Sequence, residues 1–101
     1  ELLNNTTTTL MAQVDTTGVK AVEFNYIFIR DNLVRKGVVN VVKSNADDSS
    51  LTLAVDEEYS ENGPVGATIT VYESGDYVNI AYSSTNTGIT GQIYHSLNYL
   101  A

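Results

Sequence analysis

Acidic residues gather at two points in the sequence, and Ca²⁺ coordination is the chemistry that such clusters suggest. One cluster is Asp47-Asp48, and the other is Asp56-Glu57-Glu58 with Glu61, of which Asp56, Glu58 and Glu61 are the candidate ligands. Ca²⁺ takes about six to eight oxygen ligands, several of them from carboxylates of one loop. The first cluster lacks the alternate-position spacing of a helix-loop-helix calcium site, and the second converges only if its segment bends. We therefore predict a solvated acidic rim, with no bound metal and no cofactor.

Acid–base catalysis would depend on His95, which is the only histidine of the chain. A nucleophile–base pair needs a serine beside it in space, and Ser96 is adjacent in sequence. In a strand, however, neighbouring side chains point to opposite faces. Glycosidase chemistry with two carboxylates needs a groove, and a small domain filled by its own core has little room for one. We predict that the protein is not an enzyme, and that His95 is packed or lies in an interface.

Tyrosine dominates the aromatic residues, with seven Tyr against two Phe and no Trp. Tyr72 and Tyr77 flank the turn at Ser74-Gly75, and we expect both rings on the face that points away from the core. Exposed tyrosine rings stack on sugars or anchor protein interfaces. Tyr72 and Tyr77 are therefore the predicted glycan-stacking pair. The alternative is that amphipathic tyrosines complete the rim of a β-core and keep their hydroxyl groups in water.

The positive charges of the chain are confined to one segment. All five lie between residues 20 and 43, whereas residues 44–101 hold eight of the twelve acids; the five are Lys20, Arg30, Arg35, Lys36 and Lys43. A phosphate site is one interpretation, but the acidic second half would cancel much of its attraction. Contact between basic and acidic faces of neighbouring copies is the second. The third interpretation is that the positive charges pair with acids of the other sheet of the same chain. Contact between copies and pairing within one chain remain equally open interpretations.

Composition excludes several classes of function. A chain of 101 residues suits one domain, and its formal net charge of −7 repels the phosphates of nucleic acids. The absence of Cys excludes disulfides, zinc–thiolate sites and cysteine nucleophiles. No stretch approaches the roughly 20 apolar residues of a membrane-spanning helix. Because the sequence begins at Glu1 without Met or a secretion-signal pattern, we expect a processed end or part of a longer protein.

Apolar residues alternate with polar ones at a period of two, which is typical of strands with one buried face. Clusters of Gly, Asn, Asp and Ser separate the runs, and Asp31-Asn32 and Ser74-Gly75 indicate tight hairpins. The predicted fold is an all-β antiparallel sandwich of jelly-roll-like or Greek-key type with about seven strands. We expect an extended arm or linker over 1–9 and one sandwich domain over 10–101. Within that domain, we expect a short turn within 54–62. The expected strands are roughly 8–15, 19–30, 33–44, 50–56, 66–73, 76–84 and 89–99.

Two runs are more apolar than one buried face requires, namely 22–30 and 38–42. Strands that a partner chain covers have this pattern, as do the central strands of a sandwich. We therefore predict that the protein self-associates by burying apolar strand faces between copies. The candidate interface residues are Ile27, Ile29, Val39 and Val41.

The order of strands, glycines and tyrosines resembles small β-sandwich domains near the C-terminal ends of tailed-phage structural proteins, such as tail fibres, tailspikes and head fibres. The resemblance covers most of residues 19–99 and lies in segments 22–30, 35–42, 56–59, 62–63, 77–82, 87–88 and 91–94. It implies a homotrimer in the extracellular virion that contacts other virion proteins and attaches to the host surface, with a surface glycan as a further partner. It carries over no catalytic residue.

The expected function is therefore that of a structural virion or fibre domain that self-associates, as a trimer by the resemblance. A carbohydrate-binding module that uses Tyr72 and Tyr77 is the alternative from another class. A bacterial extracellular surface or pilus-like domain shares the same composition, rich in Thr, Asn, Ser and Val. A secretion signal in the full-length gene would favour that third interpretation.

Overall fold

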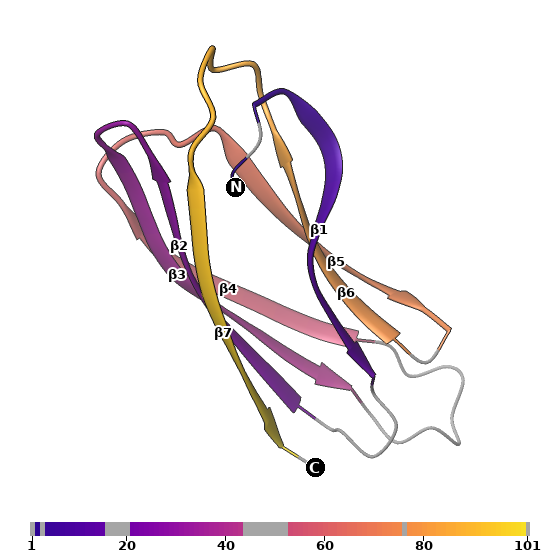
Figure 1. Ribbon diagram of the computed structural model, residues 1–101. Helices are drawn as coiled ribbons and strands as arrows, with labels where there is room; N and C mark the ends of the chain where they lie inside the picture. The colour runs from indigo at the N-terminus through magenta and orange to yellow at the C-terminus, as the bar shows by residue number, and fades with distance from the viewer. Residues whose placement is uncertain (1, 3, 16–20, 44–52, 76, 101) are drawn as a thin grey trace.

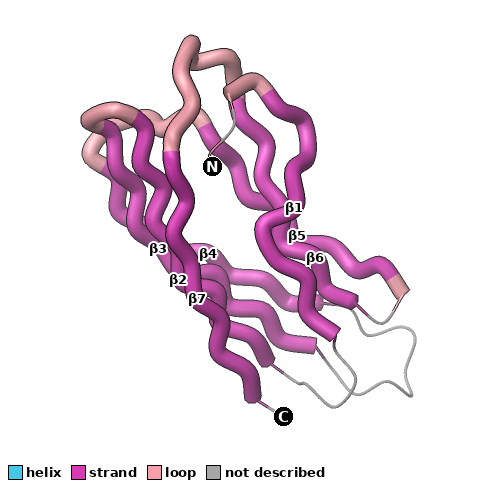
Figure 2. The backbone as a smooth tube through the Cα atoms, in the orientation of Figure 1, coloured by secondary structure: helices cyan, strands magenta, loops and turns pink. Residues whose placement is uncertain are grey.

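The computed structural model describes residues 2, 4–15, 21–43, 53–75 and 77–100. The described residues form seven strands, and none forms a helix long and apolar enough to cross a membrane (Figures 1 and 2). The strands are β1 (Thr6–Asp15), β2 (Ala21–Arg30), β3 (Leu33–Lys43), β4 (Leu53–Glu61), β5 (Ala67–Ser74), β6 (Tyr77–Ser84) and β7 (Gln92–Leu100).

The strands make two sheets that face each other across the core. The smaller sheet has the order β1-β6-β5, the larger sheet has the order β4-β3-β2-β7, and all neighbours are antiparallel. Within the larger sheet β2, β3 and β4 form a meander, and β7 returns beside β2 after the β5–β6 hairpin, which is a Greek-key order. The predicted antiparallel β-sandwich is confirmed, in its Greek-key form.

Both predicted hairpins are present, and each uses a residue with a positive φ. Arg30 pairs with Leu33 around the two-residue turn, in which Asp31 has a φ of 56°. Ser74 pairs with Tyr77, and Gly75 has a φ of 61°. Aspartate and glycine are among the residues that tolerate this conformation best. The second turn therefore begins one residue later than the sequence pattern suggests.

β4 departs from prediction because it runs through the acidic cluster. The expected strand ended at residue 56, with a short turn within 54–62, whereas β4 continues to Glu61. It pairs with β3 residue by residue, from Leu53 opposite Lys43 to Glu61 opposite Arg35. An acidic run is compatible with an edge strand, because water reaches the charges from the open side.

The predicted N-terminal arm is also different in the structure. Thr6 already belongs to β1, and Thr9 pairs with Tyr82 of β6. Further upstream, Leu2 is fully buried in the core and bridges to Gly91 through two backbone hydrogen bonds of 2.8 Å. The segment is thus a part of the sandwich, because an apolar side chain at its start fills one end of the core.

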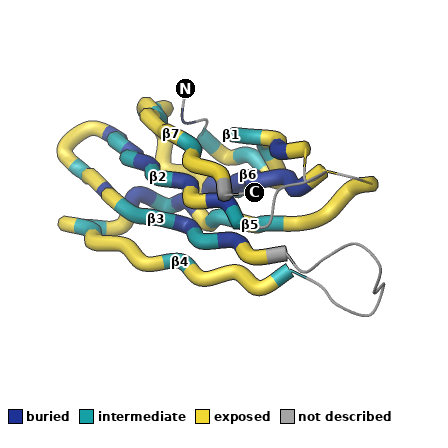
Figure 3. The backbone as a smooth tube through the Cα atoms, turned by 90° about the horizontal axis from the view of Figure 1, so that it is seen from below, coloured by how far each residue is buried: buried dark blue, intermediate teal, exposed yellow. Residues whose placement is uncertain are grey.

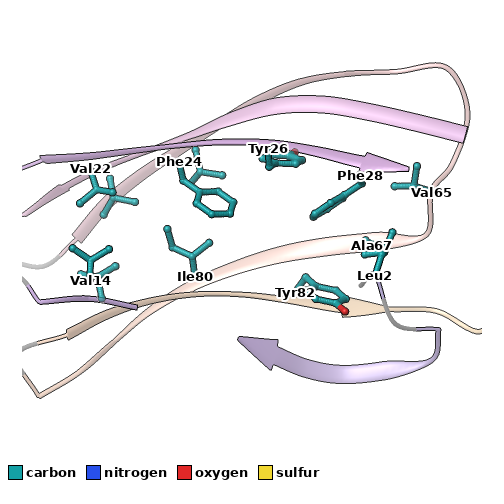
Figure 4. Close-up of a cluster of buried hydrophobic side chains, with 13 residues drawn as sticks. Leu2, Val14, Val22, Phe24, Tyr26, Phe28, Val65, Ala67, Ile80 and Tyr82 are labelled. Carbon is teal, nitrogen blue, oxygen red and sulfur yellow. The ribbon is translucent and has the colours of Figure 1, made fainter. Parts of the chain in front are cut away.

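The core lies between the facing sheets, and aromatic side chains of β2 form its centre (Figure 4). Tyr26 and Phe28 have ring centroids 4.6 Å apart, and Phe28 lies 6.1 Å from the ring of Tyr82 on the opposite sheet. Burial is uneven between strands: β6, central in the smaller sheet, is almost wholly buried, whereas β4 is mostly exposed (Figure 3).

Val39 and Val41 do not lie on a spare face, contrary to the predicted interface. They are 0% and 2% exposed and belong to the chain's own core. Val39 is the direct partner of Phe24, and partners across two strands share a face, so Val39 and Val41 point inward with the aromatic residues. Ile27 and Ile29 alternate with these positions and lie on the outer face, partly exposed.

Gly37 allows a polar contact to cross the inner face of the larger sheet. Tyr26, Gly37 and Tyr59 lie in one row across β2, β3 and β4. A Cβ atom at position 37 would lie 2.6 Å from the Tyr26 hydroxyl and 2.8 Å from the Tyr59 Cβ. The glycine thus leaves space for the Tyr26 ring, whose hydroxyl reaches past β3 and donates to the Glu57 carboxylate at 2.5 Å.

We expect Gly37→Ala to lower the free energy of unfolding by about 1–3 kcal/mol, the usual effect of overpacking. The added methyl group displaces the Tyr26 ring and strains its contact with Glu57. Urea denaturation followed by circular dichroism measures the change. Lys36→Ala, at the exposed neighbouring position, is the control and should stay within about 0.5 kcal/mol. A Gly37→Ala variant as stable as the wild type would contradict this account of the glycine.

Candidate functional site

Arg35, one residue of the basic cluster, is buried beside Glu61. Its Nε atom donates to Glu61 Oε2 at 2.7 Å, and its guanidinium lies 4.3 Å from the Tyr59 ring centroid. Burial alone would lower the pKa of Arg35, but the Glu61 carboxylate outweighs it and raises the pKa overall. The charge is thus satisfied within the chain, by a neighbouring strand and not by the other sheet.

Arg30 is likewise buried and bound within the chain. It is buried at the end of β2, and its Nη1 atom donates to the Val65 carbonyl oxygen at 2.5 Å. This contact joins β2 to the loop before β5. Of the predicted basic cluster, Lys36 is exposed, while Lys20 and the Lys43 side chain lie outside the described residues. Neither arginine is therefore available at the surface to bind a phosphate or the acidic face of a neighbouring copy.

The acidic residues of β4 do not converge as the calcium hypothesis required. Glu61 points inward toward Arg35, whereas Asp56 and Glu58 alternate with it and point outward. Within the described ranges, no three His, Asp or Glu side chains are placed to hold a metal ion. Asp47-Asp48 lies outside those ranges.

His95 and Tyr26 are placed by ring packing. The His95 ring lies on the inner side of β7, stacked 5.2 Å from the Phe24 ring, and Ser96 points to the other face as expected. Burial, followed by the hydrogen bond to the Glu57 carboxylate, raises the pKa of Tyr26 well above its ordinary value. The Tyr26 hydroxyl therefore keeps its proton as a structural donor, because ionisation would place two negative charges together.

The outer face of the larger sheet, which points away from the smaller sheet, has a polar half and an apolar half. In the polar half, Glu23 Oε1 accepts hydrogen bonds from Asn25 Nδ2 at 2.9 Å and from Asn98 Nδ2 at 3.4 Å. The apolar half carries Ile27 and Ile29, together with the exposed residues Val34 and Tyr94, and the exposed Lys36 lies opposite Ile27. A shallow hollow of about 260 Å³ lies at the border of the two halves, next to Ile27 and Tyr94.

The edges of the two sheets differ sharply in charge. Among the described strands the edges are β4 and β7 in the larger sheet and β1 and β5 in the smaller one. β4 carries four acids within nine residues, whereas β1 and β5 carry one each, namely Asp15 and Glu73. β7 carries no Asp, Glu, Lys or Arg over its nine residues. Sequence analysis overlooked β7, although its lack of charge is visible in the sequence.

Tyr72 and Tyr77 lie where the glycan hypothesis placed them, on the outer face of the smaller sheet. They are 40% and 42% exposed, and they are diagonal neighbours, because Tyr72 pairs with Asn79 and Tyr77 pairs with Ser74. Beside them, Gln13 Nε2 donates to Asn79 Oδ1 at 2.9 Å. The surface thus combines two half-exposed rings with the exposed side chain of Gln13, whereas Asn79 is buried at 3% exposure.

Comparison with known proteins identifies no relative: no family model, no curated protein and no solved structure matches this chain. The likeness to phage fibre domains therefore rests on the sequence pattern alone and stays a prediction.

We expect the stability that Tyr26 contributes to decline above pH 10. In the unfolded chain Tyr26 ionises near its ordinary pKa of 10.0, while the raised pKa keeps it protonated in the fold. The unfolded state then binds fewer protons, so the free energy of unfolding falls by up to about 1.4 kcal/mol per pH unit. Urea titrations at pH 8, 9, 10 and 11 on wild type and Tyr26→Phe test this. The advantage of wild type should shrink over that range, and a constant difference would contradict the prediction.

Proposed function

We propose that this domain is a structural, non-catalytic module that associates with copies of itself in an extracellular or virion fibre. One observation carries the proposal: three of the four edge strands of the described sandwich hold one charged residue or none, in a chain of net charge −7. An edge strand presents unpaired backbone N–H and C=O groups, and monomeric proteins guard such edges with charge. Here only β4 is guarded in that way.

The apolar half of the outer face supports the same function. Ile27 and Ile29 remain partly exposed after folding, and Val34 and Tyr94 beside them are exposed. Apolar surface removed from water stabilises a contact by about 25 cal/mol per Å². A second copy is a suitable cover, because these four side chains are uncharged and the exposed Lys36 opposite Ile27 does not repel a copy of net charge −7. Val39 and Val41 have no part in this surface.

The fibre role is supported by the sequence resemblance to tailed-phage structural proteins. By analogy, the resemblance implies three copies in an assembly, a place in the virion, and contact with other virion proteins. Domains of a shared fold host unrelated functions, so the analogy is tested separately from self-association.

Native mass spectrometry and sedimentation velocity at micromolar concentration test self-association. We expect an oligomer, and we expect its stability to change little between about 50 and 500 mM NaCl, because uncharged strands form the contact. A monomer at every concentration would contradict the proposal. An oligomer that dissociates in salt would show instead that charged faces hold the copies together. An even number of copies would leave self-association intact and contradict the trimer.

The paired tyrosines of the smaller sheet support a second candidate function, glycan binding. Tyr72 and Tyr77 present half-exposed rings on one face beside the Gln13–Asn79 amide pair. Aromatic rings stack on sugar faces, and the exposed amide of Gln13 is available to bond to a sugar hydroxyl, whereas the buried Asn79 holds that amide in place. Such a surface is compatible with host attachment by a fibre.

A glycan array followed by titration calorimetry tests that candidate. We expect Tyr77→Ala to weaken binding of a selected glycan at least tenfold, because one of the two stacking rings is lost. Ile89→Ala, which removes an exposed apolar side chain from the loop before β7, is the control and should bind like wild type. An array without binding, or equal affinity after Tyr77→Ala, would remove the candidate.

A further inference from the structure

β7 is the edge strand best prepared to pair with another chain. Its register with β2 is unbroken over nine residues, from Ala21 opposite Leu100 to Ile29 opposite Gln92. A strand held in regular register on one side presents an equally regular row of backbone groups on the other. Its sequence contains no proline and no charged residue, so it lacks the usual devices that block pairing.

The other three edges are less suited to this role. β1 has two register shifts against β6, between Thr6 and Thr9 and between Leu10 and Ala12, and bulges of this kind bend an edge away from a partner. β4 carries four acids and would repel a second copy of itself. β5 is shorter, with eight residues, and holds Glu73 near its end.

We propose that β7 of one copy pairs antiparallel with β7 of a second copy across a two-fold axis at Ser96. The inference rests on the proposed self-association and names its site. The pairing joins two larger sheets into one continuous sheet of eight strands, four from each copy. It makes a dimer, and it therefore departs from the three copies that the phage resemblance implies.

In this register, the inner-face residues of β7 in one copy are complementary to the inner-face residues of β7 in the second copy. Tyr99 faces Ile93 of the second copy, and His95 faces Leu97 of the second copy. The exposed residues of this face are Tyr99, at 55%, and His95, whereas Ile93 and Leu97 are packed against the core. Each exposed ring would thus gain an apolar neighbour, as aromatic–aliphatic cross-strand pairs require.

The outer face of β7 matches itself as well. Tyr94 faces Asn98 of the second copy, and Ser96 faces Ser96 of the second copy on the axis. Every residue in these pairs is uncharged, although each copy has a net charge of −7. The repulsion between the copies therefore comes only from charges outside the contact, which salt screens. Ser96 is exposed and points outward, so its substitution leaves the packing inside each copy intact.

A charge-swap experiment at Ser96 tests the pairing. Ser96→Lys alone and Ser96→Glu alone place like charges on the axis and should each weaken the dimer at least tenfold in sedimentation equilibrium. An equimolar mixture of the two should form a 1:1 heterodimer by native mass spectrometry, because Lys then faces Glu. Thr68→Lys, at an exposed outward position of β5, is the control and should dimerise like wild type.

The outcomes separate the inference from the proposed function. Ser96→Lys that still associates like wild type would overturn pairing at β7 and leave self-association intact. A monomeric wild type would overturn both. Because the chain contains no Cys, Ser96→Cys gives an independent readout. A short bis-maleimide reagent should link two copies of Ser96→Cys rapidly and should not link Ser60→Cys, on the exposed outer side of β4. Equal linking of both variants would contradict the register.

Discussion

The register between β2 and β3 is the constraint on which the rest of this molecule depends. Phe24 lies opposite Val39, and Tyr26 lies opposite Gly37. This register determines whether each neighbouring side chain of the two strands points to the inner or the outer face of the sheet. A slip of one residue would move the whole set to the other side of the sheet. The core aromatics, the space over Gly37 and the outward position of Ile27 therefore have a single cause. The contact from Tyr26 to Glu57 crosses three strands and opposes such a slip, because it exists only in this register.

The unequal size of the two sheets produces the surfaces that remain for binding. The smaller sheet has three strands and the larger has four, of which β4 and β7 are the outer two. Tyr59 and Tyr99 on their inner sides stay about half exposed, although they face the same way as the core. The two outer strands differ in protection: β4 carries acids, whereas β7 carries none. The proposed contact between copies uses the edge that carries no charge, because charged side chains on an edge strand oppose pairing.

Among the described residues, both arginines lie in the interior, whereas most carboxylates lie at the surface. Arg35 and Arg30 are buried, and each is bound by a named acceptor, the Glu61 carboxylate and the Val65 carbonyl oxygen. Buried cations need such partners, because a charge removed from water without one is strongly destabilising. The consequence outside is a predominantly acidic surface. Uncharged strands and tyrosine pairs are then the places where another molecule of the same charge can approach.

The sequence by itself determined the strands, the two tight hairpins and the all-β class, because side-chain alternation and turn residues are local properties. It also placed Tyr72 and Tyr77 on the outer face, since both alternate with residues of a clear apolar run. Only the tertiary structure decided which of the doubly apolar strand faces is covered. Val39 and Val41 were indistinguishable from Ile27 and Ile29 in pattern, and only pairing with Phe24 sends the valines inward. The partners of Arg30 and Arg35 were equally hidden, because they lie 35 and 26 residues away along the chain and meet only through sheet order, which no local pattern encodes.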